Sequence, residues 1–333
     1  MPNIYLTREI PEAGLAMLRE KFGTFEMNTE NRALTKLELL EKVKGRDGVL
    51  CLLNDSIDEQ VLDAAGPECK IFSNYAVGYN NIDIEAASSR GIMVTNTPGV
   101  LTDATADLAI ALLLSCARSI VPADTFTRSG KFKGWEPKLF LGQDVSGKTL
   151  GIIGAGRIGS NVARKMAKGF GMKILYVNTS ENPELEQEIG AKKVNLETLL
   201  RESDYVSLHV NFTPLTKHLI GEHELSLMKS TAILINTARG AVIDEKALVK
   251  ALQTKKIFAA GLDVYENEPA LEPGLVELPN VTIVPHIASA TIATRNTMAE
   301  MAAQSLIDAL NDKMPEFCVN KAQLKSIHTD PDF

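Results

Sequence analysis

Short apolar runs alternate with longer amphipathic stretches from the start of the chain, and this alternation predicts strands and helices in turn. In the first hundred residues, apolar runs predict strands at 4–6, 48–53, 71–75 and 93–95. Between them, apolar residues recur at helical spacing, as at 12–21 and 36–43. A strand, a helix and a further strand form the unit from which parallel sheets are built.

The same rhythm returns after residue 148 with longer apolar runs. These runs predict strands at 149–153, 173–177, 205–210, 232–235, 259–264 and 282–284. The whole pattern predicts an α/β protein with two Rossmann-like or flavodoxin-like domains, each built on a parallel sheet.

Two predicted helices have the length and position to connect these domains. Asn96-Thr97-Pro98-Gly99 interrupts the pattern, and a mostly apolar helix is predicted directly after it, at 102–118. A second helix is predicted at 292–310, after the last strand. We therefore expect two crossover helices and a cleft between the domains. The first domain is then discontinuous, and the expected boundaries are 1–100 with 288–333 for one domain and 101–287 for the other.

A glycine-rich segment after the strand at 149–153 is the most specific motif. Gly154-Ala155-Gly156-Arg157-Ile158-Gly159 fits GxGxxG and opens a predicted helix. Gly154 permits the tight turn, Gly156 lets the backbone approach a pyrophosphate, and Gly159 lets the helix pack on the strand. The phosphates would bind free N–H groups at the helix N-terminus. The strand, the spacing and the helix together favour a dinucleotide site over a glycine-rich turn without a ligand.

The residues after the strand at 173–177 are those that normally distinguish NAD from NADP. An acid there binds the ribose 2′-hydroxyl, whereas a nearby arginine accepts a 2′-phosphate. This chain has Asn178, Thr179 and Ser180 at that place. Asn178 can hydrogen-bond a hydroxyl without repelling a phosphate, and no arginine follows it. The sequence therefore predicts NAD or NADP and leaves the preference open.

Three polar segments follow predicted strands: 236–240, 263–269 and 285–289. Because ligands bind beyond the carboxyl ends of such strands, we expect Arg239, Glu268 and His286 to share one site. An arginine matches a carboxylate in geometry and charge. A glutamate beside a histidine favours the protonated imidazole, which can give its proton to a carbonyl oxygen while hydride arrives at the carbon. The three residues predict the reduction of a keto acid.

Each residue of this trio has a simpler interpretation when it is taken alone. An arginine before a glycine can cap a strand end, and a glutamate before a proline is typical of a surface turn. An isolated histidine is more often structural than catalytic. Their joint occurrence at successive strand ends favours the shared site.

At these residues the sequence resembles the D-isomer-specific 2-hydroxyacid dehydrogenase family, and within it the glyoxylate/hydroxypyruvate reductases. The resemblance covers nearly the whole chain, including residues 74–83, the glycine motif, and the three polar segments in the family's order of Arg, Glu and His. The segment 134–142, which contains Trp135, is similar to the glyoxylate-reductase branch, where it belongs to an arm that reaches the partner subunit. The resemblance therefore implies a homodimer.

The resemblance also implies a role for individual residues. Arg239 would bind the substrate carboxylate, His286 would be the acid/base, and Glu268 would orient His286 and tune its pKa. Asp263 would hold the nicotinamide amide, and Thr105 would contact the cofactor from the helix at 102–118. The further cofactor contacts that it implies are Thr237, Ala238 and Ala288, and the further substrate contacts are Leu53, Val77 and Gly78, the last two through backbone N–H groups.

This chain departs from the family pattern at three of these positions. Ala288 stands where many members have glycine, which would tighten the pocket slightly. Asn178 replaces the acid of NAD-preferring members, and Thr179 replaces the arginine that is frequent in NADP-preferring ones. The last two departures weaken the inference about cofactor preference and leave the inference about fold and chemistry unchanged.

Composition and charge exclude several other classes of protein. The chain has 333 residues, of which 45% are hydrophobic and 23% charged, the mixture of an ordinary globular protein. A net charge of −7 argues against nucleic-acid and anionic membrane partners. The longest apolar run, 108–117, is too short to span a bilayer, and the first residues do not resemble a signal peptide. Four scattered cysteines without a CxxC pair are typical of a cytoplasmic protein.

We expect no metal site. His209, His218 and His223 are the candidates, but the last two are five residues apart, which does not place two ligands on one helical face.

Together these observations predict an enzyme that reduces a small 2-keto acid, glyoxylate or hydroxypyruvate, to the D-2-hydroxy acid with NADH or NADPH. Another D-2-hydroxyacid dehydrogenase, of the D-lactate or phosphoglycerate type, is an alternative. A cofactor-sensing binding protein similar to the transcriptional corepressors of this fold is a further one.

Overall fold

The computed structural model describes residues 1–327, in two compact units. One unit is Met1–Leu101 together with the chain from Ala290 onward, and the other is Thr102–Ser289. The second unit begins with helix α5 (Thr102–Arg118), and the first resumes shortly before helix α12 (Ile292–Leu310). Residues 328–333, the end of the predicted discontinuous domain, lie outside the described residues.

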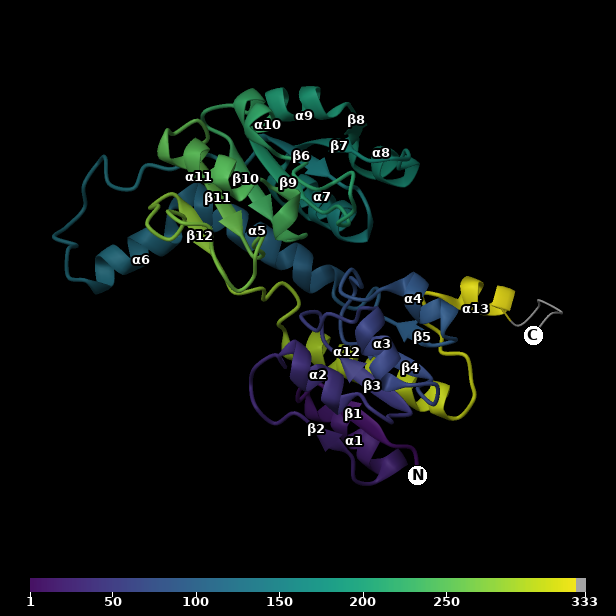
Figure 1. Cartoon of the computed structure of the whole chain (residues 1–333). Helices are drawn as coiled ribbons and strands as arrows, with labels where there is room; N and C mark the ends of the chain where they lie inside the picture. Colours follow the sequence, from purple (N-terminus) through teal and green to yellow (C-terminus); the bar gives the residue numbers. More distant parts are fainter. Residues whose placement is uncertain (328–333) are drawn as a thin grey trace. The chain divides into compact units, whose positions relative to one another are not determined.

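The first unit is built on a five-stranded sheet with the order β2-β1-β3-β4-β5 (Figure 1). Its strands are β1 (Ile4–Leu6), β2 (Glu26–Met27), β3 (Gly48–Cys51), β4 (Ile71–Asn74) and β5 (Met93–Thr95). All neighbouring strands in it are parallel. This is the flavodoxin-like order, in which the chain starts near the middle of the sheet and extends it in both directions.

Alternate residues of the first sheet face two different helix layers. Leu50 and Ile71 pack with α1 (Glu12–Phe22) and α12, whereas Val49 and Phe72 pack with the opposite layer. That opposite layer consists of α2 (Lys36–Lys42), α3 (Glu59–Ala65) and α4 (Ile84–Ser89), and α13 (Lys321–Ile327) lies against α4. Because successive side chains of a strand point to opposite faces, both faces of this sheet are covered by apolar packing, as is usual for a parallel sheet.

The second unit is built on a seven-stranded sheet with the order β12-β11-β10-β9-β6-β7-β8. Its strands are β6 (Thr149–Ile153), β7 (Lys173–Val177), β8 (Lys192–Lys193), β9 (Tyr205–Leu208), β10 (Ile233–Asn236), β11 (Ala259–Leu262) and β12 (Val281–Ile283). All are parallel to their neighbours. The direction of strand addition reverses between β6 and β9, and this reversal is where ligands bind in sheets of this kind.

Helices cover both faces of the second sheet as well. On one face lie α5, α7 (Arg157–Phe170) and α8 (Pro183–Ile189). On the other lie α9 (Leu196–Glu202), α10 (Glu222–Leu227) and α11 (Glu245–Gln253), and a short 3₁₀ turn, η1 (Gly240–Val242), follows β10. The prediction of an α/β fold with two parallel sheets is confirmed.

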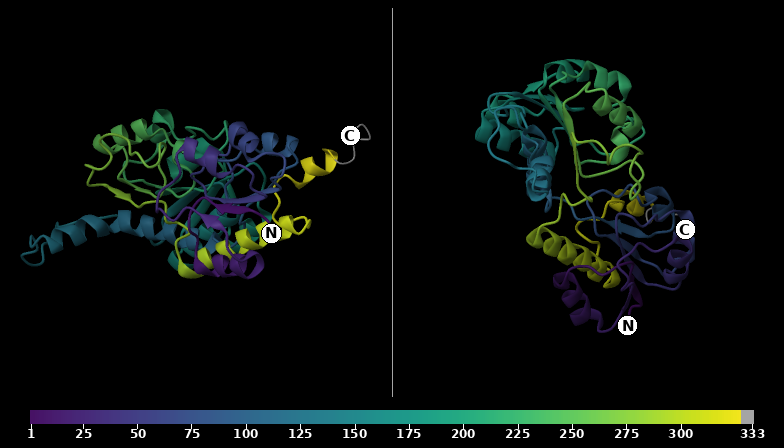
Figure 2. Two further views of the ribbon diagram at one scale, coloured as in Figure 1. Left: turned by 60° about the horizontal axis from the view of Figure 1, so that its bottom comes forward. Right: turned by 90° about the vertical axis from the view of Figure 1, so that its left-hand side faces the viewer.

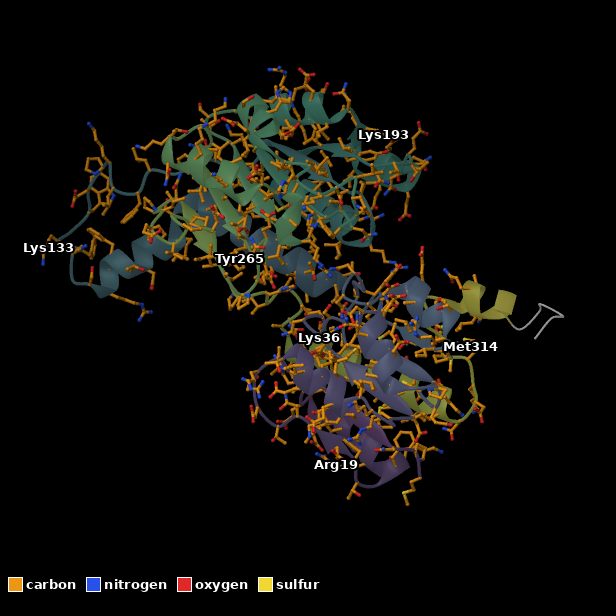
Figure 3. The ribbon with its side chains drawn as sticks, viewed as in Figure 1. Arg19, Lys36, Lys133, Lys193, Tyr265 and Met314 are labelled. Atoms are coloured by element: carbon orange, nitrogen blue, oxygen red, sulfur yellow. The ribbon has the colours of Figure 1, made fainter. Side chains whose placement is uncertain are left out.

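Residues 120–142, here called the arm, leave the body of the second unit (Figure 2). The arm starts with α6 (Ile120–Arg128), which has no buried residue, and Lys133, labelled in Figure 3, lies at its far end. Trp135 in the arm is 83% exposed. Among residues 1–327 no single helix has the length and apolar character to cross a membrane; Thr102–Ala117 and α6 meet that test only as a pair, bent by 63°.

Several strands end earlier than the sequence predicts, because their last apolar residues belong to the loops that follow. The run at 48–53, for example, stops being a strand at Cys51, where the Asp55 carboxylate accepts the N–H of Leu52 at 2.7 Å. The edge strands β2 and β8 carry no apolar alternation and were not predicted. Each has two residues, and β8 is made of two exposed lysines.

Candidate active site

The glycine motif forms the turn between β6 and α7, at the point where strand order reverses. Gly154 has φ of +98°, and a Cβ on it would lie 2.7 Å from the backbone carbonyl of His209. A Cβ on Gly159 would lie 2.1 Å from the Gly154 oxygen. These two positions therefore require glycine for the turn and for the packing of α7 on the strand.

Gly156 differs from these two glycines, because a Cβ on it would meet nothing within 4 Å. It is the N-cap of α7, and no side chain caps the helix. The N–H groups of the first turn are thus open to a ligand, and Arg157 and half-buried Ile158 follow directly. An open cradle of N–H groups at the start of a 14-residue helix fits a dinucleotide pyrophosphate.

The loop after β7 presents an accessible polar surface. Half-buried Asn178 donates from Nδ2 to the Ser180 carbonyl oxygen at 3.2 Å and to its hydroxyl at 3.3 Å, and Thr179 and Ser180 are exposed. Asn182, which the sequence analysis did not single out, donates to the Ala155 carbonyl at 3.1 Å and caps α8. Asn182 therefore ties this loop to the glycine turn.

His286 and Glu268 form a direct pair on the loops after β12 and β11. His286 Nδ1 lies 2.9 Å from Glu268 Oε2, and Glu268 Oε1 accepts the N–H of Tyr265 at 3.0 Å. Burial opposes the charge on Glu268, but His286, the Tyr265 N–H and the charge of Arg239 hold the pKa of Glu268 below its ordinary 4.5. The carboxylate is thus ionised and both its oxygens are engaged.

The backbone at His286 is held in an uncommon conformation by Asp263. His286 has φ of +53°, and Asp263 accepts the N–H groups of Ile287 at 2.6 Å and Ala288 at 2.9 Å. Asp263 is fully buried, which raises its pKa, while these N–H groups and His286 favour its charged form. Uncommon φ values of this kind, held by surrounding hydrogen bonds, occur frequently at functional sites.

Arg239 follows β10, on the segment that leads into η1. Asn236 Nδ2 donates to the Arg239 carbonyl at 2.9 Å, and Arg239 Nη1 donates to the Ala238 carbonyl at 2.7 Å. Burial lowers the pKa of Arg239 below its ordinary value, whereas the charge of Glu268 opposes this change. Next to it, Thr237 Oγ1 is buried without a hydrogen-bond partner, which leaves a polar atom for a ligand to satisfy.

Thr105 lies on α5, 4% exposed, within the same unit as the cofactor candidates. The predicted substrate residues Leu53, Val77 and Gly78 lie in the other unit, on the loops after β3 and β4. Leu53 is 36% exposed.

Asparagine side chains hold the loops of that first unit. Asn96 donates to the Val77 carbonyl at 2.7 Å, and Asn74 donates to the Gly78 carbonyl at 3.0 Å. Asn81 donates at 3.1 Å to the carbonyls of Leu52 and Asp55. Asn74 and Asn81 fall in the segment 74–83 that carries the family resemblance, but the sequence alone did not show that they fix loop carbonyls.

No group of three or more His, Cys, Asp or Glu side chains within residues 1–327 has the arrangement of a metal site. His209 is half-buried with Nε2 2.8 Å from Ser207 Oγ, and loss of solvation lowers its pKa to about 3. His218 pairs instead with Glu266, and His223 is exposed on α10.

A glycine turn at the switch point of a parallel sheet, with His286, Glu268 and Arg239 on neighbouring loops of that unit, indicates an NAD(P)-dependent oxidoreductase. Comparison with known proteins agrees. Residues 110–288 match the NAD binding domain of the D-isomer specific 2-hydroxyacid dehydrogenases. The chain is 54% identical over 329 residues to a glyoxylate reductase of Thermococcus litoralis, with 98% of each chain covered.

Solved structures of related proteins have the same fold. A glyoxylate reductase from Paecilomyes thermophila superposes with a TM-score of 0.84 at 36% identity, covering 97% of this chain and all of the other. An NADPH-dependent glyoxylate/hydroxypyruvate reductase from Sinorhizobium meliloti, in complex with NADP and malonate, gives 0.83 at 32% identity and 97% coverage of both. The chain therefore belongs to the D-isomer-specific 2-hydroxyacid dehydrogenase family, and its cofactor is NAD or NADP.

Proposed function

We propose that this chain reduces a small 2-keto acid, glyoxylate or hydroxypyruvate, to the D-2-hydroxy acid with NADH or NADPH. The observation that carries the proposal is the 2.9 Å contact between His286 Nδ1 and Glu268 Oε2, in the unit that also holds the glycine turn and Arg239. The glyoxylate reductases to which the chain is similar over nearly its whole length support this choice of substrate.

In this proposal the three side chains divide the work. Arg239 binds the substrate carboxylate through its planar guanidinium. Glu268 holds Nδ1 of His286, which leaves Nε2 to donate a proton to the carbonyl oxygen. After the reduction, His286 recovers a proton from solvent, so that one proton is consumed in each turnover. Glu268 is a positioning residue, because it acts through the histidine.

The residues proposed to hold the dinucleotide lie in the unit Thr102–Ser289. Gly154, Gly156, Arg157, Ile158 and Gly159 would receive the pyrophosphate, and Asn178, Thr179 and Ser180 the adenosine ribose. The nicotinamide half would contact Thr105, Thr237, Ala238, Asp263 and Ala288, and buried, unbonded Thr237 Oγ1 supports its inclusion. When bound, the reduced nicotinamide supplies the hydride that reduces the carbonyl carbon.

We assign residues 101–287 to dinucleotide binding and residues 1–100 with 288–333 to substrate binding. Leu53, Val77 and Gly78 would line the substrate pocket, the last two through backbone N–H groups. The hydrogen bonds from Asn96 and Asn74 to the carbonyls of Val77 and Gly78 support this role, because they fix the loop that would receive a carboxylate.

We further propose a cytoplasmic homodimer. The four cysteines are free thiols, three of them buried, as is usual in a reducing compartment. The arm exposes Phe132, Trp135 and Leu141, 54%, 83% and 69% accessible, and α6 buries no residue of its own. A second copy of the chain would cover this apolar surface.

Initial rates of NADH and NADPH oxidation, measured in parallel with glyoxylate, hydroxypyruvate and pyruvate, test the reaction. We expect turnover with the first two keto acids. Comparison of the rates with NADH and with NADPH shows which cofactor Asn178 and Thr179 favour. Turnover with pyruvate alone would move the assignment to a D-lactate type. Cofactor binding without turnover of any keto acid would contradict the enzyme proposal and favour a cofactor sensor.

His286→Ala tests the proposed proton donor. The variant should lose about 10²- to 10⁴-fold in kcat, because the proton then has to come from water. Dinucleotide affinity, measured by fluorescence titration, should stay the same, since His286 is not among the proposed cofactor residues. His223→Ala is the matched control, because His223 is an exposed residue of α10. Near-normal kcat in His286→Ala would refute the assignment.

A further inference from the structure

A short segment before α10 lies against the turn that follows Arg239. The N–H of His218 donates to the Ala241 carbonyl at 2.8 Å, and the N–H of Ile220 donates to the Val242 carbonyl at 3.1 Å. Ile220 also forms a parallel bridge with Ile243. Backbone bonds therefore fix His218 relative to the segment that carries Arg239.

The side chain of His218 reaches a different loop, the one that carries Glu268. His218 Nε2 lies 2.6 Å from Glu266 Oε1, and the Glu266 N–H donates to Glu245 Oε1 at 2.9 Å. Glu245 is 3% exposed at the start of α11, so that Glu266 is held from two sides. Two residues further along, Glu268 binds His286.

These two loops also touch directly, without a side chain between them. A Cβ on Gly240 would lie 1.8 Å from the Tyr265 carbonyl carbon and 2.2 Å from the Glu266 nitrogen. Tyr265, labelled in Figure 3, lies on the loop after β11. Such a backbone-to-backbone contact excludes any side chain at Gly240, and hydrogen bonds from other segments then contribute to the alignment of the two loops.

His218 itself has an unfavourable backbone conformation, with φ of +50°. Non-glycine residues in this region cost free energy, and they occur where the surrounding bonds require them. Here the bonds are the backbone tie to Ala241 on one side and the side-chain tie to Glu266 on the other.

We propose that His218, together with Glu266 and Glu245, is a positioning clamp that sets the distance between the carboxylate anchor Arg239 and the Glu268–His286 pair. This rests on the proposed function, since the clamp aligns the two ends of a keto acid. The clamp residues contact neither substrate nor cofactor. Their effect is to hold the loop that carries Arg239 at a fixed position relative to the loop that carries Glu268.

Removal of the clamp should damage alignment more than it damages folding. His218→Ala should lower kcat/KM for glyoxylate by about 10- to 100-fold, because small misplacements of reacting groups have effects of this size. Both a higher KM and a lower kcat contribute, whereas dinucleotide affinity and melting temperature stay close to those of the parent. His218→Gln keeps a donor for Glu266 and should recover most of the loss.

Two comparisons separate a clamp from a merely structural residue. His223→Ala, the same change five positions further on, should leave kcat/KM unchanged. In a double-mutant cycle, adding Glu266→Ala to His218→Ala should cost little more than either change alone, because both break the contact between His218 Nε2 and Glu266 Oε1. Fully additive losses, or a folded His218→Ala variant with the kcat/KM of the parent, would overturn the clamp.

Amide hydrogen exchange keeps this test independent of the reaction. Exchange at residues 237–243 and 264–268 should quicken in His218→Ala and not in His223→Ala. Unchanged exchange in both loops would overturn the clamp even in an active enzyme. A parent protein that turns over no keto acid would refute the proposed function instead, and the exchange pattern would still report on the contact.

Discussion

Asp263 shows how one buried side chain fixes the backbone of a neighbouring residue, His286, the proposed proton donor. Its two oxygens accept the N–H groups of Ile287 and Ala288. These bonds secure the turn in which His286 has a positive φ. A carboxylate has about four acceptor sites, so the proposed contact with a nicotinamide amide is compatible with this role. Substitution of Asp263 should therefore disturb the proposed proton donor His286 as well as the proposed contact with the cofactor.

Glu268 gives a stability prediction at the same scale. Because its pKa is lowered in the folded protein, its stabilising contribution is complete above 4.5, the ordinary value, and is lost as the pH falls through the lowered pKa. The difference in melting temperature between the parent and Glu268→Gln should therefore shrink as the pH falls below 4.5.

Glu277→Gln is the control for this measurement, because Glu277 is an exposed glutamate in the same unit. Its melting curves should follow those of the parent at every pH. A difference between the parent and Glu268→Gln that does not change between neutral and acid pH would contradict the ionised Glu268 pair.

At the scale of single elements, helix α7 contains two glycines in different surroundings. Gly159 is packed against the glycine turn, whereas Gly169 faces open space. Gly159→Ala would place a methyl group 2.1 Å from the Gly154 oxygen, whereas Gly169→Ala would meet nothing within 4 Å. We expect Gly159→Ala to lower the free energy of unfolding by about 1–3 kcal/mol through overpacking and to weaken dinucleotide binding.

Gly169→Ala is the matched control and should raise stability by about 0.5–1 kcal/mol, because alanine is the better helix former. Thermal unfolding and fluorescence titration with NADPH measure both effects. Equal behaviour of the two variants would contradict the close packing of α7 on the glycine turn.

Local patterns along the chain predicted the β6–α7–β7 unit, because strand, glycine spacing and helix periodicity all occur within thirty residues of one another. They also predicted which loops carry Arg239, Glu268 and His286, since polar residues at strand ends are visible in sequence. They did not predict Asn182 or the bond from Asn96 to Val77. These side chains act on backbone atoms that folding brings close, and asparagine in a loop has no distinctive spacing.

The same reason explains why His218 was considered only as a metal-ligand candidate. Its partner Glu266 is 48 residues away, and its backbone partner Ala241 lies on a third segment. The short edge strands β2 and β8 were missed for a different reason. Two residues are too few to produce a periodic signal, and their strand conformation depends on the neighbouring strand to which they are bonded.

At the scale of the whole molecule, the arm is a segment whose apolar side chains are exposed in the single chain. If a second copy covers it, Trp135→Ala should weaken dimerisation by about 2 kcal/mol or more, as large buried aromatic residues do at interfaces. Light scattering combined with gel filtration over a dilution series would measure this. Leu215→Ala is the control, because Leu215 is 90% exposed in the same unit but outside the arm.

A dilution series in which Trp135→Ala and Leu215→Ala dissociate alike would argue against the arm as the dimer contact. A parent chain that is monomeric at every concentration would argue against the dimer itself.

Because the chain returns to its first unit only at Ala290, the two units become complete in a different order from the one in which they begin. Met298, Ala302 and Leu306 of α12 complete the core beneath β3 and β4, so this core lacks one wall until α12 has left the ribosome. The unit Thr102–Ser289 is continuous and is synthesised before α12. During vectorial synthesis we therefore expect the later-starting unit to fold first, while α1 alone covers this face of the N-terminal sheet and leaves part of it exposed. Nascent chains halted before residue 292 should accordingly attract chaperones at their N-terminal segment.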